Sequence, residues 1–165
     1  MKKLFILAIA AMAFAACGGN GGSSSKVEPL KEGVNFDMEN YSIMLPTGME
    51  ETYKSGDILN ASCPDGAKFV INYYTGGPTK SQLKTTGDGL KGMVHAWDQS
   101  AVSEDPVVDG NMVTLKSKLG DNVRYDFSYL KEDRIGVTGN FEFPESEAAK
   151  YDGMFLPILK SVVFK

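Results

Sequence analysis

The sequence predicts a single α+β domain in which an antiparallel β-sheet of about five to six strands is packed by two helices. Alternating apolar and polar residues, typical of half-buried strands, occupy residues 41–74 and 111–143. Apolar residues at helical spacing occupy 83–101 and 151–162. The expected order is two or three strands, a helix, three strands and a second helix. An antiparallel sheet with both helices against it buries every apolar face.

The first sixteen residues have the layout of a secretory signal peptide. Lys2 and Lys3 precede an apolar run from Leu4 to Phe14, and small residues follow that run. As a helix the run would rise about 16 Å, which is too short to cross a bilayer. We therefore expect residues 1–16 to be a signal peptide and the protein to be exported.

Residues 14–17, Phe-Ala-Ala-Cys, resemble the lipobox of bacterial lipoproteins. In that family the cysteine is acylated, with palmitate among the acyl groups, and the chain is cut just before it. The resemblance implies lipidation of Cys17 and a membrane-anchored protein on the periplasmic or surface face of the bacterial cell envelope. More than one acyl chain is needed for stable anchoring. The alternative is an ordinary signal peptide followed by a chance cysteine.

A glycine- and serine-rich stretch follows Cys17. Residues 18–26 offer almost no side chains that could pack, which is typical of a flexible linker. We expect residues 17–34 to form a lipidated tether with a reach of roughly 20–25 Å. Residues 35–165 are then the single folded domain.

The first strands of this domain are short. Apolar residues alternate over 41–45, and Pro46 stops that strand. Residues 46–57 are expected to form a polar connection. Residues 58–63 and 67–74 are predicted to form a hairpin, because a Pro-Asp-Gly turn joins them.

A helix is predicted from Ser81 to about Gln99. Its apolar stripe consists of Leu83, Leu90, Val94, Trp97 and Ala101. Three glycines within the helix each cost about 1 kcal/mol relative to alanine, so packing must hold it. This favours burial of Trp97 against the aromatic face of the sheet. The alternative is that Trp97 lines an open ligand groove.

The second half of the chain predicts a three-stranded meander and a closing helix. Strands are expected at 111–118, 123–130 and 135–143, each with one apolar and one mostly polar face. The helix carries an apolar stripe of Tyr151, Phe155, Ile158, Leu159 and Val162. Gly153 and Pro157 should kink or split this helix.

Three short stretches resemble PsbP-like domains. They are Tyr-Ser-Ile-Met-Leu-Pro at 41–46, Val-Thr-Gly-Asn-Phe at 137–141 and Leu-Lys-Ser-Val-Val-Phe at 159–164. Met49 stands near the place where a tryptophan is common in that family. The resemblance implies an α/β sandwich that acts as a binding or assembly module rather than an enzyme.

The composition limits the chemistry. A net charge of −4 argues against a nucleic-acid binder, which would need a basic face. One histidine and two cysteines do not suit a disulfide scaffold or a Cys/His zinc site. The Gly-x-Gly-x-x-Gly match at 87–92 lacks the buried strand that a dinucleotide site requires. Residues 105–111 lack the ligand spacing of a calcium loop. We therefore expect no metal, no cofactor and no catalytic residue.

Two residues keep an enzymatic alternative open. His95 and Cys63 are the candidate groups of a small envelope hydrolase, although His95 suits a helix end and Cys63 suits buried packing. The aromatic residues of the sheet are expected to form the core, with a ligand groove as the alternative; they are Tyr73, Tyr74, Tyr125, Phe127, Tyr129, Phe141 and Phe143. The leading hypothesis is a lipid-anchored envelope module that binds an unknown envelope protein or small ligand. A purely structural envelope lipoprotein is the third alternative.

Overall fold

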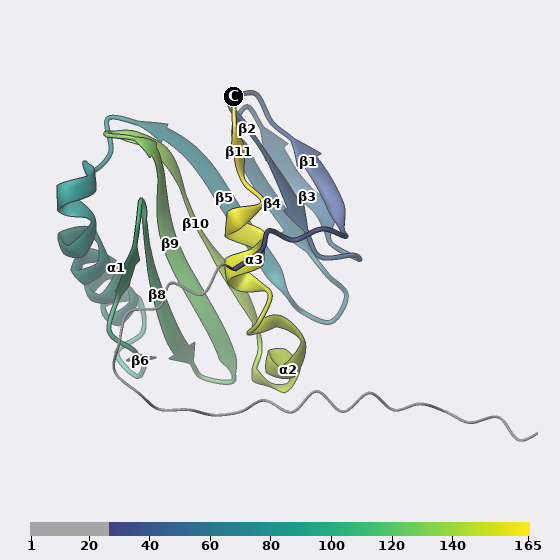
Figure 1. Cartoon of the computed structure of the whole chain (residues 1–165). Coiled ribbons are helices and arrows are strands. Elements are labelled where there is room, and N and C mark those ends of the chain that lie inside the picture. The colour runs from purple at the N-terminus through teal and green to yellow at the C-terminus, as the bar shows by residue number, and fades with distance from the viewer. Residues whose placement is uncertain (1–26) are drawn as a thin grey trace, which may run out of the picture.

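The computed structural model describes residues 27–165 and arranges them in three layers (Figure 1). The strands are β1 (Val34–Asp37), β2 (Tyr41–Leu45), β3 (Glu50–Ser55), β4 (Ile58–Ser62), β5 (Lys68–Thr75), β6 (Val102–Ser103), β7 (Val107–Asp109), β8 (Met112–Leu119), β9 (Asn122–Glu132), β10 (Ile135–Pro144) and β11 (Val163–Phe164). The helices are α1 (Leu83–Trp97), α2 (Ala148–Tyr151) and α3 (Phe155–Lys160). Short 3-10 turns precede α1 at Lys80–Gln82 and α2 at Glu145–Glu147.

The central layer is an eight-stranded antiparallel sheet. Its strand order is β3-β4-β5-β10-β9-β8-β6, and β7 also pairs with β8. The predicted hairpin (β4 and β5) and the predicted meander (β8, β9 and β10) join through the pairing of β5 with β10. A smaller antiparallel sheet, β1-β2-β11, forms part of the layer on one side.

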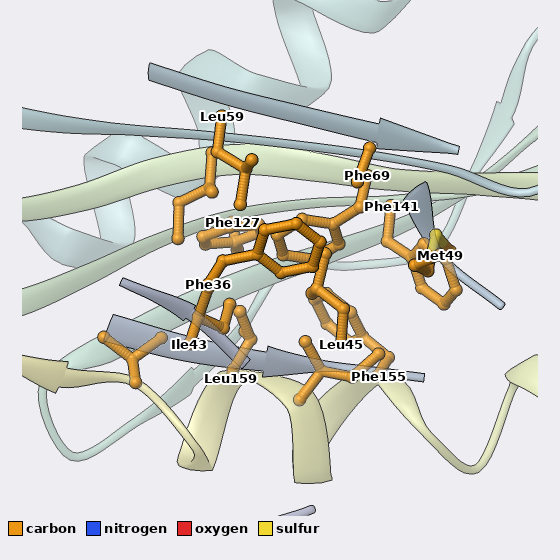
Figure 2. Close-up of a cluster of buried hydrophobic side chains, with 14 of the residues drawn as sticks. Phe36, Ile43, Leu45, Met49, Leu59, Phe69, Phe127, Phe141, Phe155 and Leu159 are labelled. Atoms are coloured by element: carbon orange, nitrogen blue, oxygen red, sulfur yellow. The ribbon is translucent and has the colours of Figure 1, made fainter. Parts of the chain in front are cut away.

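The main core fills the space between the large sheet and the layer made of the small sheet, α2 and α3 (Figure 2). Figure 2 shows Phe69, Phe127 and Phe141 of the large sheet facing Ile43 and Leu45 of β2, with the side chains of α3 beside them. The predicted stripe of the closing helix is buried at all five positions. Gly153 lies where that helix splits into α2 and α3, as predicted, whereas Pro157 lies inside α3.

A second, smaller core lies under α1 on the other face of the large sheet. Leu83, Leu90 and Val94 pack against β8 and β9. Gly87 sets the distance between helix and sheet, because a Cβ there would lie 2.6 Å from Cβ of Pro106 and 2.9 Å from Cγ2 of Val113. The helix packs mainly on β7, β8 and β9, at one end of the sheet (Figure 1).

The mixed α+β architecture with antiparallel sheets agrees with the sequence prediction, but the strand count does not. Residues 27–165 contain eleven strands rather than five or six. The expected polar connection at 46–57 contains β3, which the pattern hides because all six of its residues are exposed. The domain also starts earlier than Asn35. Leu30 packs against the core, its amide donates to the Pro157 carbonyl, and β1 begins at Val34.

Candidate functional site: the open face of the large sheet

One face of the large sheet is covered only at one end, and the covering element is helix α1. On that face α1 packs over β7, β8 and β9, while β10, β5, β4 and β3 carry no helix (Figure 1). We call the part between α1 and β3 the open face. Its side chains alternate with the buried core residues along each strand, because successive residues of a strand point to opposite sides.

The strand register defines three rows of side chains that cross the open face. The middle row runs Tyr53, Asn60, Val70, Asn140 and Asp126. A second row runs Glu50, Ser62, Lys68, Glu142 and Arg124, and a third runs Ser55, Ile58, Asn72, Thr138 and Ser128. Directly paired residues of an antiparallel sheet lie on the same face, so each row is contiguous. The open face is therefore mostly polar and includes few apolar side chains.

A charged cluster lies where the open face meets α1. The Arg124 guanidinium donates from Nε to both oxygens of Asp126 at 3.0 Å, and from Nη2 to Oδ1 at 2.8 Å. Its Nη1 lies 3.7 Å from Oε2 of Glu142, whose other oxygen accepts from Asn122. The Asp126 side chain is only 5% exposed. Burial raises the pKa of Asp126, and the Arg124 guanidinium opposes that rise.

Trp97 stands above this cluster and is not part of the core. The guanidinium of Arg124 lies 5.4 Å from the centre of the indole ring, and 65% of Trp97 is exposed to solvent. The prediction of a buried Trp97 is therefore wrong. The helix ends at Trp97, and below it the sheet presents charged Arg124 instead of an apolar side chain. The buried part of the predicted stripe is Leu83, Leu90, Val94 and Ala101.

Tyr53 flanks the open face on its opposite side. It pairs with Asn60 at the β3 edge, and 51% of it is exposed. Four strand spacings separate β3 from β9, which places the two aromatic flanks about 19 Å apart across the strands. Between them, Oδ1 of Asn60 is inaccessible to solvent and has no hydrogen-bond partner among the described residues. Buried polar atoms normally have such a partner, so this oxygen is unusual.

The other aromatic candidates divide between core and rim. Phe127, Phe141 and Phe143 are fully buried, which confirms the core interpretation for them. Tyr73, Tyr125 and Tyr129 are half-buried and pack against the main core. Tyr74 lies on the α1 side and shares a 2.9 Å hydrogen bond with Ser128.

The structure does not bring together the two candidate hydrolase residues. Cys63 is buried in the main core, just after β4, and the pKa of its neighbour Tyr151 is raised chiefly by burial. His95 is exposed in the last turn of α1, on the opposite side of the large sheet. The match at 87–92 lies inside α1, so it does not form the strand-to-helix turn that holds a phosphate.

Two further hollows lie away from the open face. One, of about 310 Å³, includes Lys116, Lys118, Glu145 and Asp152, which pair with one another as Lys116–Asp152 at 2.8 Å and Lys118–Glu145 at 2.7 Å. The other, of about 350 Å³, is lined by Leu30, Pro46, Met154 and neighbouring residues where the chain enters the domain. Neither hollow contains an unpaired buried charge.

The described residues, 27–165, contain neither a cluster of metal ligands nor a membrane-spanning helix. In that range no three side chains of His, Cys, Asp or Glu are grouped so that they could hold a metal ion. None of the helices there is long and apolar enough to cross a bilayer. The predicted signal peptide and Cys17 lie outside the described residues.

Sequence reasoning missed most of the open face. The alternation in β9 placed Arg124 and Asp126 on the polar side of the meander, which was a usable signal. The sequence alone could not place Asn60 and Tyr53 on the same face as Arg124 and Asp126. The pairing of β5 with β10 brings these residues onto one face, and it links distant parts of the chain.

Comparisons with known proteins identify the fold. The chain is similar to the solution structure of cyanobacterial PsbP (CyanoP) from Synechocystis, with a TM-score of 0.51 and 14% identity. That match covers 88% of this chain and 98% of that one, so the fold is PsbP-like. A crystal structure from Bacteroides thetaiotaomicron also matches, with a TM-score of 0.49, 14% identity and 82% of this chain covered. The chain spans about half (49%) of its length. No family model matches the chain, and neither does any curated protein sequence.

Proposed function

We propose that this protein is a non-catalytic binding or assembly-accessory module of the bacterial cell envelope, with the open face as its recognition surface. Acyl chains on Cys17 hold it to the membrane, and the folded domain faces the periplasm or the cell surface. The lipobox-like residues support the anchor. The PsbP-like fold supports the general type of module.

The observation that carries the proposed recognition surface is the exposure of Trp97 beside a buried ion pair. Tryptophan is a large apolar side chain, and this one has its indole ring at the rim of a half-covered polar surface. Aromatic and arginine side chains are those most enriched at binding hot spots. The open face combines both with a set of polar side chains that the strand register fixes in place.

The local chemistry favours binding over hydrolysis. Both oxygens of Asp126 accept hydrogen bonds from Arg124, so this carboxylate is poorly placed to move a proton for a substrate. His95 and Cys63 lie on opposite sides of the sheet, and neither can activate the other. The hydrolase alternative therefore has no geometry in its favour.

Site-specific photo-crosslinking on the full chain in its own cells tests the proposed surface. A photoreactive residue at Asn72, which is exposed on the open face, should give a covalent adduct with an envelope component. The matched control is the same residue at Val163, which is 61% exposed on β11 in the other layer of the domain. Only the Asn72 position should give the adduct.

The result also separates the alternatives. Equal adducts at both positions, or none at Asn72, would contradict a recognition surface here and favour a purely structural envelope lipoprotein. Digesting the adduct with protease distinguishes a partner protein from a ligand of another class. Both of those results support the proposed function.

A further inference from the structure

We infer that the ligand of the open face is a neutral oligosaccharide that lies across the strands between Trp97 and Tyr53. This inference rests on the proposed function, because it assigns a ligand class to the same surface. Three properties of the described residues lead to it: balanced charge, a mixture of hydrogen-bond donors and acceptors, and aromatic rings at both ends.

Charge on β4, β5, β10 and β9 balances within the open face, and Glu50 adds one exposed carboxylate at the β3 edge. Asp126 and Glu142 are matched by Arg124 and Lys68, which lies opposite Glu142 in the register. The donors of Arg124 point at the two carboxylates. A charged ligand would have to compete with this ion pair, whose Asp126 member is buried, and separating such a pair is costly. The four strands between Trp97 and the β3 edge therefore complement an uncharged ligand.

The polar side chains between the aromatic flanks suit hydroxyl groups. Asn60, Asn72 and Asn140 each offer an amide that can both donate and accept, and Thr138 adds a hydroxyl. Oδ1 of Asn60 has no hydrogen-bond partner in the described part of the chain but is shielded from solvent, so the accessible groups of this set are the side chains of Asn72, Asn140 and Thr138. A sugar presents adjacent hydroxyl groups that donate and accept at once. A protein partner would be expected to need a larger apolar centre than Val70 and Ile58 provide.

The aromatic flanks fix the length and the orientation of the ligand. Sugar rings carry faces of C–H groups that pack against aromatic rings, and Trp97 and Tyr53 are both more than half exposed. The two flanks lie about 19 Å apart across the strands. One sugar ring cannot reach both, whereas a chain of a few rings can. The surface thus fits an extended oligosaccharide better than a monosaccharide.

Trp97 is the only tryptophan, so its fluorescence reports binding directly. The full chain, held in a detergent without a sugar head group, is titrated with maltohexaose, cellohexaose and chitohexaose. At least one of these neutral chains should shift the emission to shorter wavelength and protect Trp97 from acrylamide. The corresponding monosaccharides should bind at least about tenfold more weakly. Binding should hardly change between low and high salt, because the ligand carries no charge.

Variants measured by calorimetry locate the ligand. Trp97→Ala and Tyr53→Ala should each weaken binding of the hexasaccharide by roughly tenfold. The control, Val163→Ala, should bind like the wild type. Circular dichroism shows whether each variant is folded. If Trp97→Ala does not fold, Tyr53→Ala still tests the inference.

Three results would overturn the inference. They are no response to any neutral hexasaccharide, tighter binding of oligogalacturonate or oligolysine, and equal affinity in the Trp97→Ala and Val163→Ala variants. If the Asn72 adduct then proves to be a protein, the proposed function stands and only the ligand class fails. If Asn72 also gives no adduct, both fail.

Discussion

Trp97 has 65% of its surface in solvent, and the guanidinium of Arg124 lies 5.4 Å from the centre of its ring. An exposed cation–π contact is worth about 0.5–1 kcal/mol, far less than a buried aromatic ring contributes. The residue therefore adds little to stability. Its position at the end of α1 therefore bears on the proposed recognition surface rather than on folding.

Replacing Trp97 by alanine should lower the free energy of unfolding by less than about 1 kcal/mol. The control is Phe127→Ala, which removes a fully buried ring and should cost about 3–5 kcal/mol. Urea unfolding followed by far-UV circular dichroism measures both variants without a tryptophan signal. A loss for Trp97→Ala close to that of Phe127→Ala would show that the indole belongs to the core.

Asp65 links the turn after β4 to α2. It accepts hydrogen bonds from Nζ of Lys150 at 2.5 Å and from the hydroxyl of Tyr151 at 2.7 Å. The hydrogen bond from Lys150 holds the pKa of Asp65 below its ordinary value of 3.8. The pKa of Asp65 is therefore lower in the folded state than in the unfolded state. Its carboxylate stabilises the fold fully when the pH is above the ordinary pKa. This contribution is lost as the pH falls through the folded-state pKa.

The variant Asp65→Asn should therefore be less stable than the wild type at neutral pH, by less than about 1 kcal/mol because the ion pair is partly exposed. The difference should shrink below about pH 4 as the wild-type carboxylate becomes protonated. Urea midpoints measured from neutral to acidic pH test this. A difference that grows on acidification would contradict the assigned role of Lys150.

At the scale of elements, the packing of α1 depends on the absence of one side chain. Gly87 faces Pro106 and Val113 at distances that leave no room for a Cβ, whereas Gly89 and Gly92 face open space. Alanine at an exposed helix position stabilises by about 1 kcal/mol relative to glycine. At Gly87 the gain in helix propensity is opposed by overpacking, which typically costs about 1–3 kcal/mol.

Gly89→Ala should thus raise the free energy of unfolding by about 1 kcal/mol, and Gly87→Ala should lower it by up to about 2 kcal/mol. The two substitutions are the same chemical change two residues apart, so they control for each other. Thermal or urea unfolding of both variants is sufficient. If Gly87→Ala instead stabilised the protein, α1 would have to move away from β7 and β8 without a loss of stability, which would contradict the tight packing at Gly87.

The elements that could be predicted are those whose residues divide between core and solvent. β2, β5, β8, β9 and β10 have that division, and so do the closing helices. β3 has exposed residues throughout, and β6, β7 and β11 are two or three residues long, so no periodic pattern marks them. Hydrophobic alternation cannot reveal a strand that has no buried face.

For the whole molecule, the order of the strands decides where the candidate site lies. The sequence placed Arg124 on a polar strand face and Trp97 on a helix, but not beside each other. The antiparallel pairing of β5 with β10 joins two units separated by α1, and that non-local contact creates the open face. The part of the same sheet face that α1 covers forms the second core, while the open face is mostly polar.

Anchoring is a property of the whole chain that the domain does not determine. If the protein is a lipoprotein, as we propose, replacing Cys17 by serine should block acylation and the linked cleavage, because the proposal makes the Cys17 thiol the group that receives the lipid. The variant should run larger on a gel and fail to partition into detergent like the wild type. A variant that matures to the wild-type size and still partitions into detergent would contradict the lipoprotein interpretation.

The central claim is that the sheet face beside α1 is open and that Trp97 stands at its rim. Acrylamide quenching of the single tryptophan in the purified full chain tests it most directly. We expect red-shifted emission and quenching close to that of free tryptophan amide, because 65% of Trp97 is exposed. Blue-shifted emission that acrylamide hardly quenches would place Trp97 in the core and contradict the open face.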